Sequence, residues 1–217
     1  FTVEQAKTLA RDLNLGALPV PIKLISSQTI GATLGADVLT KGIYSGLIGF
    51  AIITLFMILW YRLPGLVAVV SLIIYVALML TLFKLIPVTL TAAGMAGFIL
   101  SIGIAVDANV LIFERLKEEL RGDKKMSEAM VDGFSRAWLS IRDSNLSSLI
   151  SAVVLFWFGT SLIKGFALTM ALGIMISMFT AIIVTRTLLL ALGVKHKTPF
   201  TTFLFGSGFL KAKSYQL

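Results

Sequence analysis

Five long apolar segments constrain the fold of this chain more than any other feature. They lie at about residues 42–60, 64–83, 88–113, 137–159 and 163–192. Each one approaches or exceeds the roughly twenty residues that an α-helix needs to cross the hydrocarbon core of a bilayer. Inside lipid a chain must satisfy its own backbone hydrogen bonds, which a helix does within a single segment. The sequence therefore predicts an all-α membrane protein with five transmembrane helices.

Composition supports this class and excludes several others. Apolar residues make up 57% of the 217-residue chain and charged residues only 14%, proportions far from those of soluble domains. The net charge of +8 comes from basic residues between and after the apolar segments, without the interleaved aromatic and basic residues of a nucleic-acid surface. The chain has no cysteine and no HExxH, P-loop or GxSxG motif. We therefore expect no enzyme activity, no metal, no cofactor and no nucleic-acid partner.

The two ends of the chain are interpreted as parts outside the bilayer. Residues 1–40 begin with an amphipathic helical pattern and continue through Pro19 and Pro21 into a short β-prone stretch. We predict that they are the end of an outside α+β domain and its linker. The chain begins with Phe1, which suggests a fragment of a longer protein. Residues 194–217 alternate phenylalanines with lysines, a pattern typical of a segment that lies on membrane lipids.

The distribution of basic residues predicts the orientation of the spans. The connection at 60–64, the segment 114–136 and the tail at 194–217 carry most of the lysines and arginines, whereas the opposite connections carry Lys84 and Lys164. Because basic loops remain in the cytoplasm, we expect the tail and the segment 114–136 to be cytoplasmic and the N-terminal segment to lie outside. The segment 114–136 is interpreted as a solvated loop with one or two interfacial helices.

Asp107 lies inside the third apolar segment and is the strongest candidate for function. An ionisable side chain at membrane depth costs several kcal/mol and by default indicates a functional site. About seven residues separate it from the charges that begin at Glu114, so at about 1.5 Å per residue it lies roughly 10 Å inside the cytoplasmic boundary. Ala96 and Gly103 lie within about 40° of it on a helix, which leaves room for water or a partner side chain. We expect a buried carboxyl that loads and unloads a proton. The alternative is a permanently paired aspartate that only fixes helix positions.

Other polar residues predict a cluster that supports Asp107. Asn109 lies about 200° from Asp107 on the same helix and therefore faces a different neighbour. The fourth segment begins with a polar half that includes Arg142, Asp143 and Asn145. Such a density of polar groups is tolerated at membrane depth only inside protein or beside a water-filled cavity. If this half packs against the third segment, these side chains form a polar cluster on the cytoplasmic side. The alternative for Arg142 is that it snorkels to the interface.

Small residues recur every four positions in the third and fifth segments. The candidate helix-packing positions are Gly97, Ser101, Gly103, Gly165, Gly173 and Ser177. Small residues let membrane helices approach closely, so these two segments are predicted to form the centre of the bundle. The second segment offers only Ser71 and Tyr75 as polar groups and is expected to pack against lipid.

Two longer motifs carry a resemblance. The strings GIAVDANVLIFERLKEEL and FGTSLIKGFALTMALGIMISMFTAIIVTR resemble the paired membrane signatures of the SecD family of bacterial protein-export subunits, which is part of the RND superfamily. The resemblance extends from about Leu15 to Leu192. The second signature normally reads FGTGPIKGFA, so Ser161 and Leu162 stand where Gly and Pro are usual, and the outside turn is expected to be less sharply fixed. Arg142 stands where relatives often have an apolar residue.

The resemblance implies both a fold and a function. Members have six spans in a half-transporter arrangement, so the present chain would hold spans two to six. The family implies a bacterial inner-membrane subunit that pairs with SecF beside the SecYEG channel and uses the proton-motive force to promote translocation of polypeptides. Asp107 would be the proton relay, with protons as the coupling ion, and Asp143 and Asn145 would line the same interior. An RND-type exporter half for a small molecule or lipid, and a purely structural assembly subunit, are the alternatives.

Overall fold

Every regular element of the described chain is helical. The computed structural model describes residues 2–14, 32–86, 88–122, 124–192 and 204–205. These residues belong to two units, Phe1–Leu34 and Gly35–Leu217. The absence of strands within the described residues confirms the predicted all-α membrane fold. The β-prone stretch at 22–27, on which the prediction of an α+β remnant rests, lies outside the described residues.

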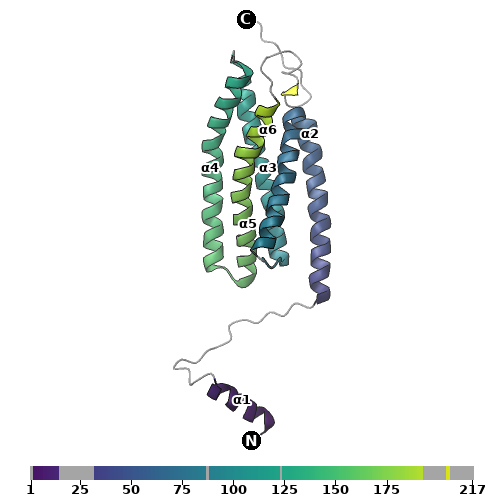
Figure 1. Ribbon diagram of the computed structural model, residues 1–217, viewed down its shortest axis with the longest axis vertical. Coiled ribbons are helices and arrows are strands. Elements are labelled where there is room, and N and C mark those ends of the chain that lie inside the picture. The colour runs from purple at the N-terminus through teal and green to yellow at the C-terminus, as the bar shows by residue number, and fades with distance from the viewer. Residues whose placement is uncertain (1, 15–31, 87, 123, 193–203, 206–217) are drawn as a thin grey trace. The chain divides into compact units, whose positions relative to one another are not determined.

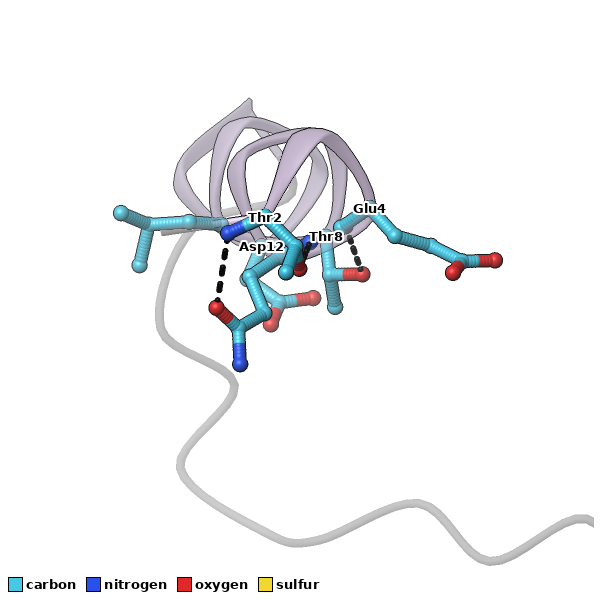
Figure 2. Close-up of a pocket in the computed structure, with 6 residues that line it drawn as sticks. Thr2, Glu4, Thr8 and Asp12 are labelled. Carbon is cyan, nitrogen blue, oxygen red and sulfur yellow. Dashed lines mark hydrogen bonds between the residues drawn. The ribbon is translucent and has the colours of Figure 1, made fainter.

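The first unit contributes one described helix, α1 (Val3–Asn14). It begins with a capping box, in which the Thr2 amide donates to Gln5 Oε1 at 3.0 Å and the Gln5 amide donates to Thr2 Oγ1 at 3.4 Å (Figure 2). A hollow of about 510 Å³ lies along this helix. Figure 2 shows residues that line it, among them Glu4 and Asp12. A single helix with exposed side chains supplies all the described walls of this hollow, so it lacks the enclosure of a binding site.

α2 (Ala32–Leu85) begins the second unit's bundle and reverses direction near its middle. Arg62 has φ 51° and ψ −114°, a conformation outside the helical region. In a straight helix, Met57 and Gly65 would be about 12 Å apart. Yet a Cβ atom added to Gly65 would come closer than 3.0 Å to the Met57 carbonyl oxygen. The chain therefore turns back on itself at Arg62, and glycine is needed where the two arms cross.

This reversal divides α2 into a first arm, residues 32–61, and a second arm, residues 63–85 (Figure 1). The second arm is part of the core, because Leu72, Tyr75 and Met79 are buried. The expectation that this segment packs against lipid is wrong. Hydropathy alone does not separate a lipid-facing helix from one that faces protein, since both are apolar. The first arm carries the more exposed large apolar side chains, at Tyr44, Leu47, Ile48, Ile52 and Leu55, although one side of the second arm also exposes Leu66, Val70, Ile73 and Leu80.

The rest of the bundle consists of two long helices and a third that changes type. The remaining elements are α3 (Ala92–Leu120), α4 (Met126–Phe158), α5 (Ser161–Phe179), the π-helix η1 (Thr180–Thr185) and α6 (Arg186–Ala191). The last three follow one another without a break. The helices predicted within the segment 114–136 are present, but they are the ends of α3 and α4 instead of separate interfacial helices, and only residues 121–125 connect them. Charged side chains on the two helix ends pair with one another, which lets the helices continue beyond the apolar segments.

Within the described residues, four helical stretches are long and apolar enough to cross a membrane. They are residues 37–85, 92–120, 126–158 and 161–191. The first of these holds both arms of α2, so it contains two of the five predicted spans. The helix count is therefore lower than predicted only because α2 is continuous through its reversal.

α3 lies at the centre of this bundle and packs against α4 and α5 (Figure 1). On its other side Ile102 and Ala105 join Leu72 and Tyr75 of the second arm in one apolar cluster. Ile112 lies further along α3, in a second cluster that also includes residues of α2, α4 and α6. The predicted central position of the third segment is thus observed. One face of α3 remains uncovered, and it carries Asp107.

Candidate functional site

Asp107 lies on an exposed face of α3. The same face carries Ala96, Leu100 and Gly103, and we call these four residues the Asp107 face. A Cβ atom added to Gly103 would meet nothing within 4 Å, so this glycine packs against no other helix in the described part of the chain. No hydrogen bond or ion pair from a described residue reaches the Asp107 carboxylate. The other helices leave this face open, so the carboxyl is not buried within this chain, and its position at membrane depth stays a prediction.

An exposed carboxylate on a membrane helix needs polar surroundings. α3 is apolar enough to cross a bilayer, and lipid cannot solvate a charged group at that depth. The carboxylate must therefore face water, face another protein surface, or be protonated. The small side chains of Ala96 and Gly103 would let another helix come close to the α3 backbone beside it. The Asp107 face thus has the properties of one half of a site.

Asn109 occupies the opposite side of α3 and is only 3% exposed. Its Nδ2 donates to the Ala105 carbonyl at 3.2 Å, and its Oδ1 accepts a hydrogen bond from Thr185 Oγ1 at 2.7 Å. Thr185 Oγ1 also lies 2.9 Å from Ser71 Oγ, and both of these side chains are buried. We call Asn109, Thr185 and Ser71 the Asn109 bridge. It joins α3, the π-helix η1 and the second arm of α2.

Sequence reasoning missed two members of the Asn109 bridge. Ser71 was noted but given no role, and Thr185 was not considered. Ser177 is the last small residue named above in the fifth segment, and two further steps of four, through Ala181, reach Thr185. On an ideal α-helix each step of four drifts by about 40°, so the stripe alone does not place Thr185 on the core side. The turn of π-helix before it changes that register.

Small residues bring α3 and α5 into close contact. Thr169 Oγ1 donates across the interface to the Gly94 carbonyl at 2.9 Å. A Cβ atom added to Gly97 would come closer than 3.0 Å to both Thr169 Oγ1 and the Phe166 carbonyl oxygen. Only glycine fits at position 97 with these helix positions.

A second close contact joins the same two helices to the second arm of α2. The hydroxyl oxygens of Tyr75 and Ser101 are 2.6 Å apart, and a Cβ atom added to Gly173 would come closer than 3.0 Å to each. Gly165 lies near the start of α5, where an added Cβ would lie 3.1 Å from Thr91 Oγ1. The hydroxyl of Ser177, another predicted packing position, is buried and donates to the Ile174 carbonyl at 2.8 Å within its own helix.

The polar half of α4 does not gather around Asp107. Arg142 and Asp143 are exposed and pair with each other, with Arg142 Nε 2.9 Å from Asp143 Oδ1. Asn145 is buried, and its Nδ2 donates to the Ile141 carbonyl at 2.9 Å. No hydrogen bond or ion pair between described residues joins these three side chains to Asp107 or Asn109. The predicted cluster is therefore not formed within this chain, because its members satisfy their hydrogen bonds locally.

A separate group of ion pairs lies where α3 ends and α4 begins. Glu119 is only 8% exposed on its side chain and contacts Arg136 Nη1 and Lys124 Nζ, the latter at 2.6 Å. Lys124 also lies 2.6 Å from Asp132, and its hydrogen bonds to Asp132 and Glu119 raise the pKa of this lysine. We call these four residues the Glu119 cluster. Sequence reasoning missed it because a solvated loop with one or two interfacial helices does not bring Glu119 and Arg136 together.

Comparison with known proteins identifies the family of this bundle. The sequence model of the family described as protein export membrane protein SecD/SecF, C-terminal, matches residues 15–195. The chain belongs to this family. Protein translocase subunit SecD of Thermobaculum terrenum is 60% identical over 192 residues, which cover 87% of this chain and 37% of that relative. The SecD subunit of Synechocystis is 51% identical over 192 residues, or 88% of this chain and 41% of the relative. The chain thus spans about two fifths of the length of these curated SecD relatives.

Solved SecDF structures share the fold described above. The crystal structure of SecDF from Thermus thermophilus, described as a translocon-associated membrane protein, aligns with a TM-score of 0.77 at 40% identity, covering 91% of this chain and 28% of that one. A structure of SecDF in a super-membrane-facing form aligns with a TM-score of 0.70 at 41% identity, covering 90% and 27%. These matches confirm the predicted resemblance to the SecD family. The chain is a membrane protein of the SecD type.

Proposed function

We propose that this chain is the membrane part of a SecD-type subunit that uses protons to promote the translocation and release of exported polypeptides. The proposal is carried by the exposed carboxylate of Asp107, which no described residue pairs with, on a helix able to cross a membrane. The similar proteins are named protein translocase subunits, which favours polypeptide export over export of a small molecule or lipid. No covalent catalysis enters the proposal, and protons are the only coupling ion.

A partner subunit would cover the Asp107 face. The matching family comprises both SecD and SecF, and the similar solved structures are of SecDF. We therefore propose SecF as the partner, with its helices against Ala96 and Gly103. Such a neighbour would exclude lipid from Asp107 and could supply a counter-charge. The SecYEG channel and the exported polypeptide would be further partners of the complete complex.

The basic end of the bundle would face the cytoplasm of a bacterial cell. The Tyr61 hydroxyl donates to Glu114 Oε1 at 3.2 Å, so the reversal of α2 lies beside the cytoplasmic end proposed for α3. Basic residues of the reversal and of the α3 to α4 connection are thereby brought to one end. The positive-inside rule then makes this end cytoplasmic in the inner membrane, with the N-terminal segment outside and the C-terminal tail inside.

Proton binding at Asp107 would change which arrangement of α3 is favoured. As a carboxylate, Asp107 needs water or a cation beside it; once protonated, it tolerates an apolar neighbour. A proton taken up from the outside and released to the cytoplasm would therefore shift the population between two packings of α3 and its partner. This cycle would supply the mechanical step that moves an exported chain outward.

The proposal is tested by export of a reporter protein into vesicles under an imposed proton gradient, with the complete complex and matched expression. Asp107→Asn removes the titratable group with little change in shape and is expected to abolish the gradient-dependent part of export. Asp143→Asn is the matched control, because Asp143 is an exposed carboxylate paired with Arg142, and export should be retained. Undiminished gradient-driven export in an assembled Asp107→Asn complex would overturn the proposal and leave Asp107 as a packing residue.

A further inference from the structure

The Asn109 bridge lies where it can set the rotation of α3 about its own axis. We propose that the Thr185 hydroxyl, at the end of the π-helix η1, is a positioning group for Asp107 that acts through Asn109. This inference deepens the proposed function, on which it rests for the role of Asp107. The contacts that carry it are independent of that role.

Asp107 and Asn109 are two residues apart on one helix and point in nearly opposite directions. Asn109 is buried and Asp107 is exposed, so they mark the fixed and the open side of α3. Because a helix turns as a unit, any rotation that moves the Asp107 carboxylate also moves the Asn109 amide. The hydrogen bond of 2.7 Å from Thr185 Oγ1 to Asn109 Oδ1 resists such a rotation at the level of Asp107.

The hydroxyl groups of Ser71 and Thr185 have fewer protons than the contacts they make. The Ser71 hydroxyl lies 2.9 Å from Thr185 Oγ1 and 3.4 Å from the Thr180 carbonyl oxygen. Each hydroxyl has a single proton, so the contacts cannot all be hydrogen bonds at once. In one arrangement Ser71 donates to Thr185 and Thr185 donates to Asn109. In a second, Thr185 donates to Asn109 and Ser71 donates to the Thr180 carbonyl. In a third, Thr185 donates to Ser71 and Ser71 donates to the Thr180 carbonyl, which leaves Asn109 Oδ1 without its donor.

The shorter distances, 2.7 and 2.9 Å, favour the first arrangement, which holds Asn109. The arrangement that releases the Asn109 amide needs the longest contact, 3.4 Å. Thr185, Ser71 and Asn109 are all buried, so bulk water does not replace the lost hydrogen bond. The Asn109 bridge therefore has discrete hydrogen-bond patterns, two that hold Asn109 and one that releases it.

The π-helix adds an element that can change register. η1 begins at Thr180 and ends at Thr185. It therefore contains both Thr185, a member of the Asn109 bridge, and Thr180, whose carbonyl oxygen contacts Ser71. π-helical turns are rare and are frequently found at functional sites. α5 packs against α3 on one side of this turn, while Thr185 bonds to Asn109 at its other end. The π-helical turn thus couples the position of Thr185 to the packing of α5.

The experiment compares variants that differ in a single hydroxyl. Thr185→Val keeps the shape of threonine and removes the hydroxyl, whereas Thr185→Ser keeps the hydroxyl. Thr54→Val is a matched control, because the Thr54 hydroxyl is buried and has no hydrogen-bond partner among the described residues. The rotation of α3 is read from Gly103→Cys, one turn from Asp107 on the face that the proposed partner would cover, as the rate at which its thiol reacts with a maleimide. Every variant carries Gly103→Cys and is compared with Gly103→Cys alone. The chain contains no other cysteine.

Each variant is made in the complete complex in vesicles, and labelling is measured without a proton gradient. We expect Thr185→Val to change the labelling rate by about threefold or more and to lower gradient-driven export by about tenfold, the range expected for loss of one buried hydrogen bond. Thr185→Ser and Thr54→Val should stay within about twofold of the rates of Gly103→Cys alone. If Thr185→Val does not assemble, Thr185→Ala and Thr185→Ser give the same comparison with two smaller side chains.

Two results would overturn the inference. One is the absence of an effect that depends on the hydroxyl. It would be seen as an unchanged labelling rate in Thr185→Val, or as a loss of export in Thr185→Ser as large as that in Thr185→Val. The other is a changed labelling rate with undiminished gradient-driven export, which would separate the position of α3 from proton coupling. A separate result, full gradient-driven export by Asp107→Asn, would show that the proposed function fails. The labelling rate reports on the Asn109 bridge whether or not export depends on Asp107.

Discussion

The two sides of α3 show how differently one helix can use two neighbouring polar residues. Asp107 is ionisable and has no hydrogen-bond or ion-pair partner among the described residues, on a face that includes small side chains. Asn109 is neutral and buried, and both ends of its amide are hydrogen-bonded. The ionisable group is thus left for an external neighbour, while the neutral group joins helices of the same chain. A residue that must change protonation needs access to a partner or water, whereas a residue that fixes helices needs complete hydrogen bonding.

The largest effect on stability is expected from adding a side-chain atom where α3 and α5 are in close contact, on the buried side of α3. Gly97→Ala places a Cβ atom closer than 3.0 Å to Thr169 and to the Phe166 carbonyl, so the backbones of α3 and α5 must separate. We expect a loss of about 2–3 kcal/mol, typical of overpacking. Gly103→Ala, on the Asp107 face, meets nothing within 4 Å and should change the stability of this chain by about 0.5 kcal/mol or less. Thermal unfolding in detergent measures both variants, and equal losses would contradict the distinction between the two faces.

Removing the two polar side chains should separate stability from function. Asn109→Ala leaves the Thr185 hydroxyl without its amide acceptor, and we expect a loss of about 1–2 kcal/mol. Asp107→Ala breaks no hydrogen bond to a described residue, so the stability of the isolated chain should change by about 0.5 kcal/mol or less. Urea unfolding of the chain in detergent, without its partner, gives both values. A larger loss for Asp107→Ala would show that the Asp107 face is packed within this chain.

The same comparison can be repeated at the end of α3, where Glu118 and Glu119 are neighbours. The side chain of Glu119 is 8% exposed and contacts Lys124 and Arg136, whereas that of Glu118 is 45% exposed. Glu119→Gln should lower the midpoint of thermal unfolding by a few degrees, about twice the change for Glu118→Gln. The raised pKa of Lys124 means that its contribution is complete at neutral pH and is lost only as the pH rises through that raised pKa. An equal, salt-sensitive change in both variants would show that the Glu119 cluster is solvated.

The smallest effect is expected at Thr54. Its hydroxyl is buried without a hydrogen-bond partner among the described residues, so Thr54→Val loses no observed interaction. We expect a change in unfolding free energy within about 0.5 kcal/mol, in either direction. Thr185→Val is the informative comparison, because it removes a bonded hydroxyl of the same residue type. A loss at Thr54 as large as that at Thr185 would indicate that the Thr54 hydroxyl has a partner in the assembled complex.

Much of the fold could be predicted because membrane helices leave a strong signal. Apolar segments of about twenty residues predict helices directly, and small residues such as Gly97 and Gly173 predict where helices approach. The continuation of α3 and α4 through the segment 114–136 was missed, because a charged segment was interpreted as solvent-exposed loop. Its ion pairs across the two helices, such as Glu119 with Arg136, join residues whose side chains meet only after the two helices fold back on each other.

The candidate site could be predicted only in part. Asp107 was found because an ionisable residue inside an apolar segment stands out by itself. Its exposure, the local pairing of Arg142 with Asp143 and the separate burial of Asn145 depend on which helix covers which face. Spacing gives the angle of a residue around its own helix, but it does not identify the neighbour on that side.

Hydropathy and residue spacing alone predict a bundle of membrane helices, and they single out Asp107 and the small residues that allow close packing. These features depend on hydrophobicity and on spacing within one segment, which act before any helix meets another. Only the tertiary structure decided that Asn109 bonds to Thr185 and Ser71 while Asp107 faces outward. The physical reason is that a hydrogen bond between helices needs a particular rotation of each, and the packing of the whole bundle sets those rotations together.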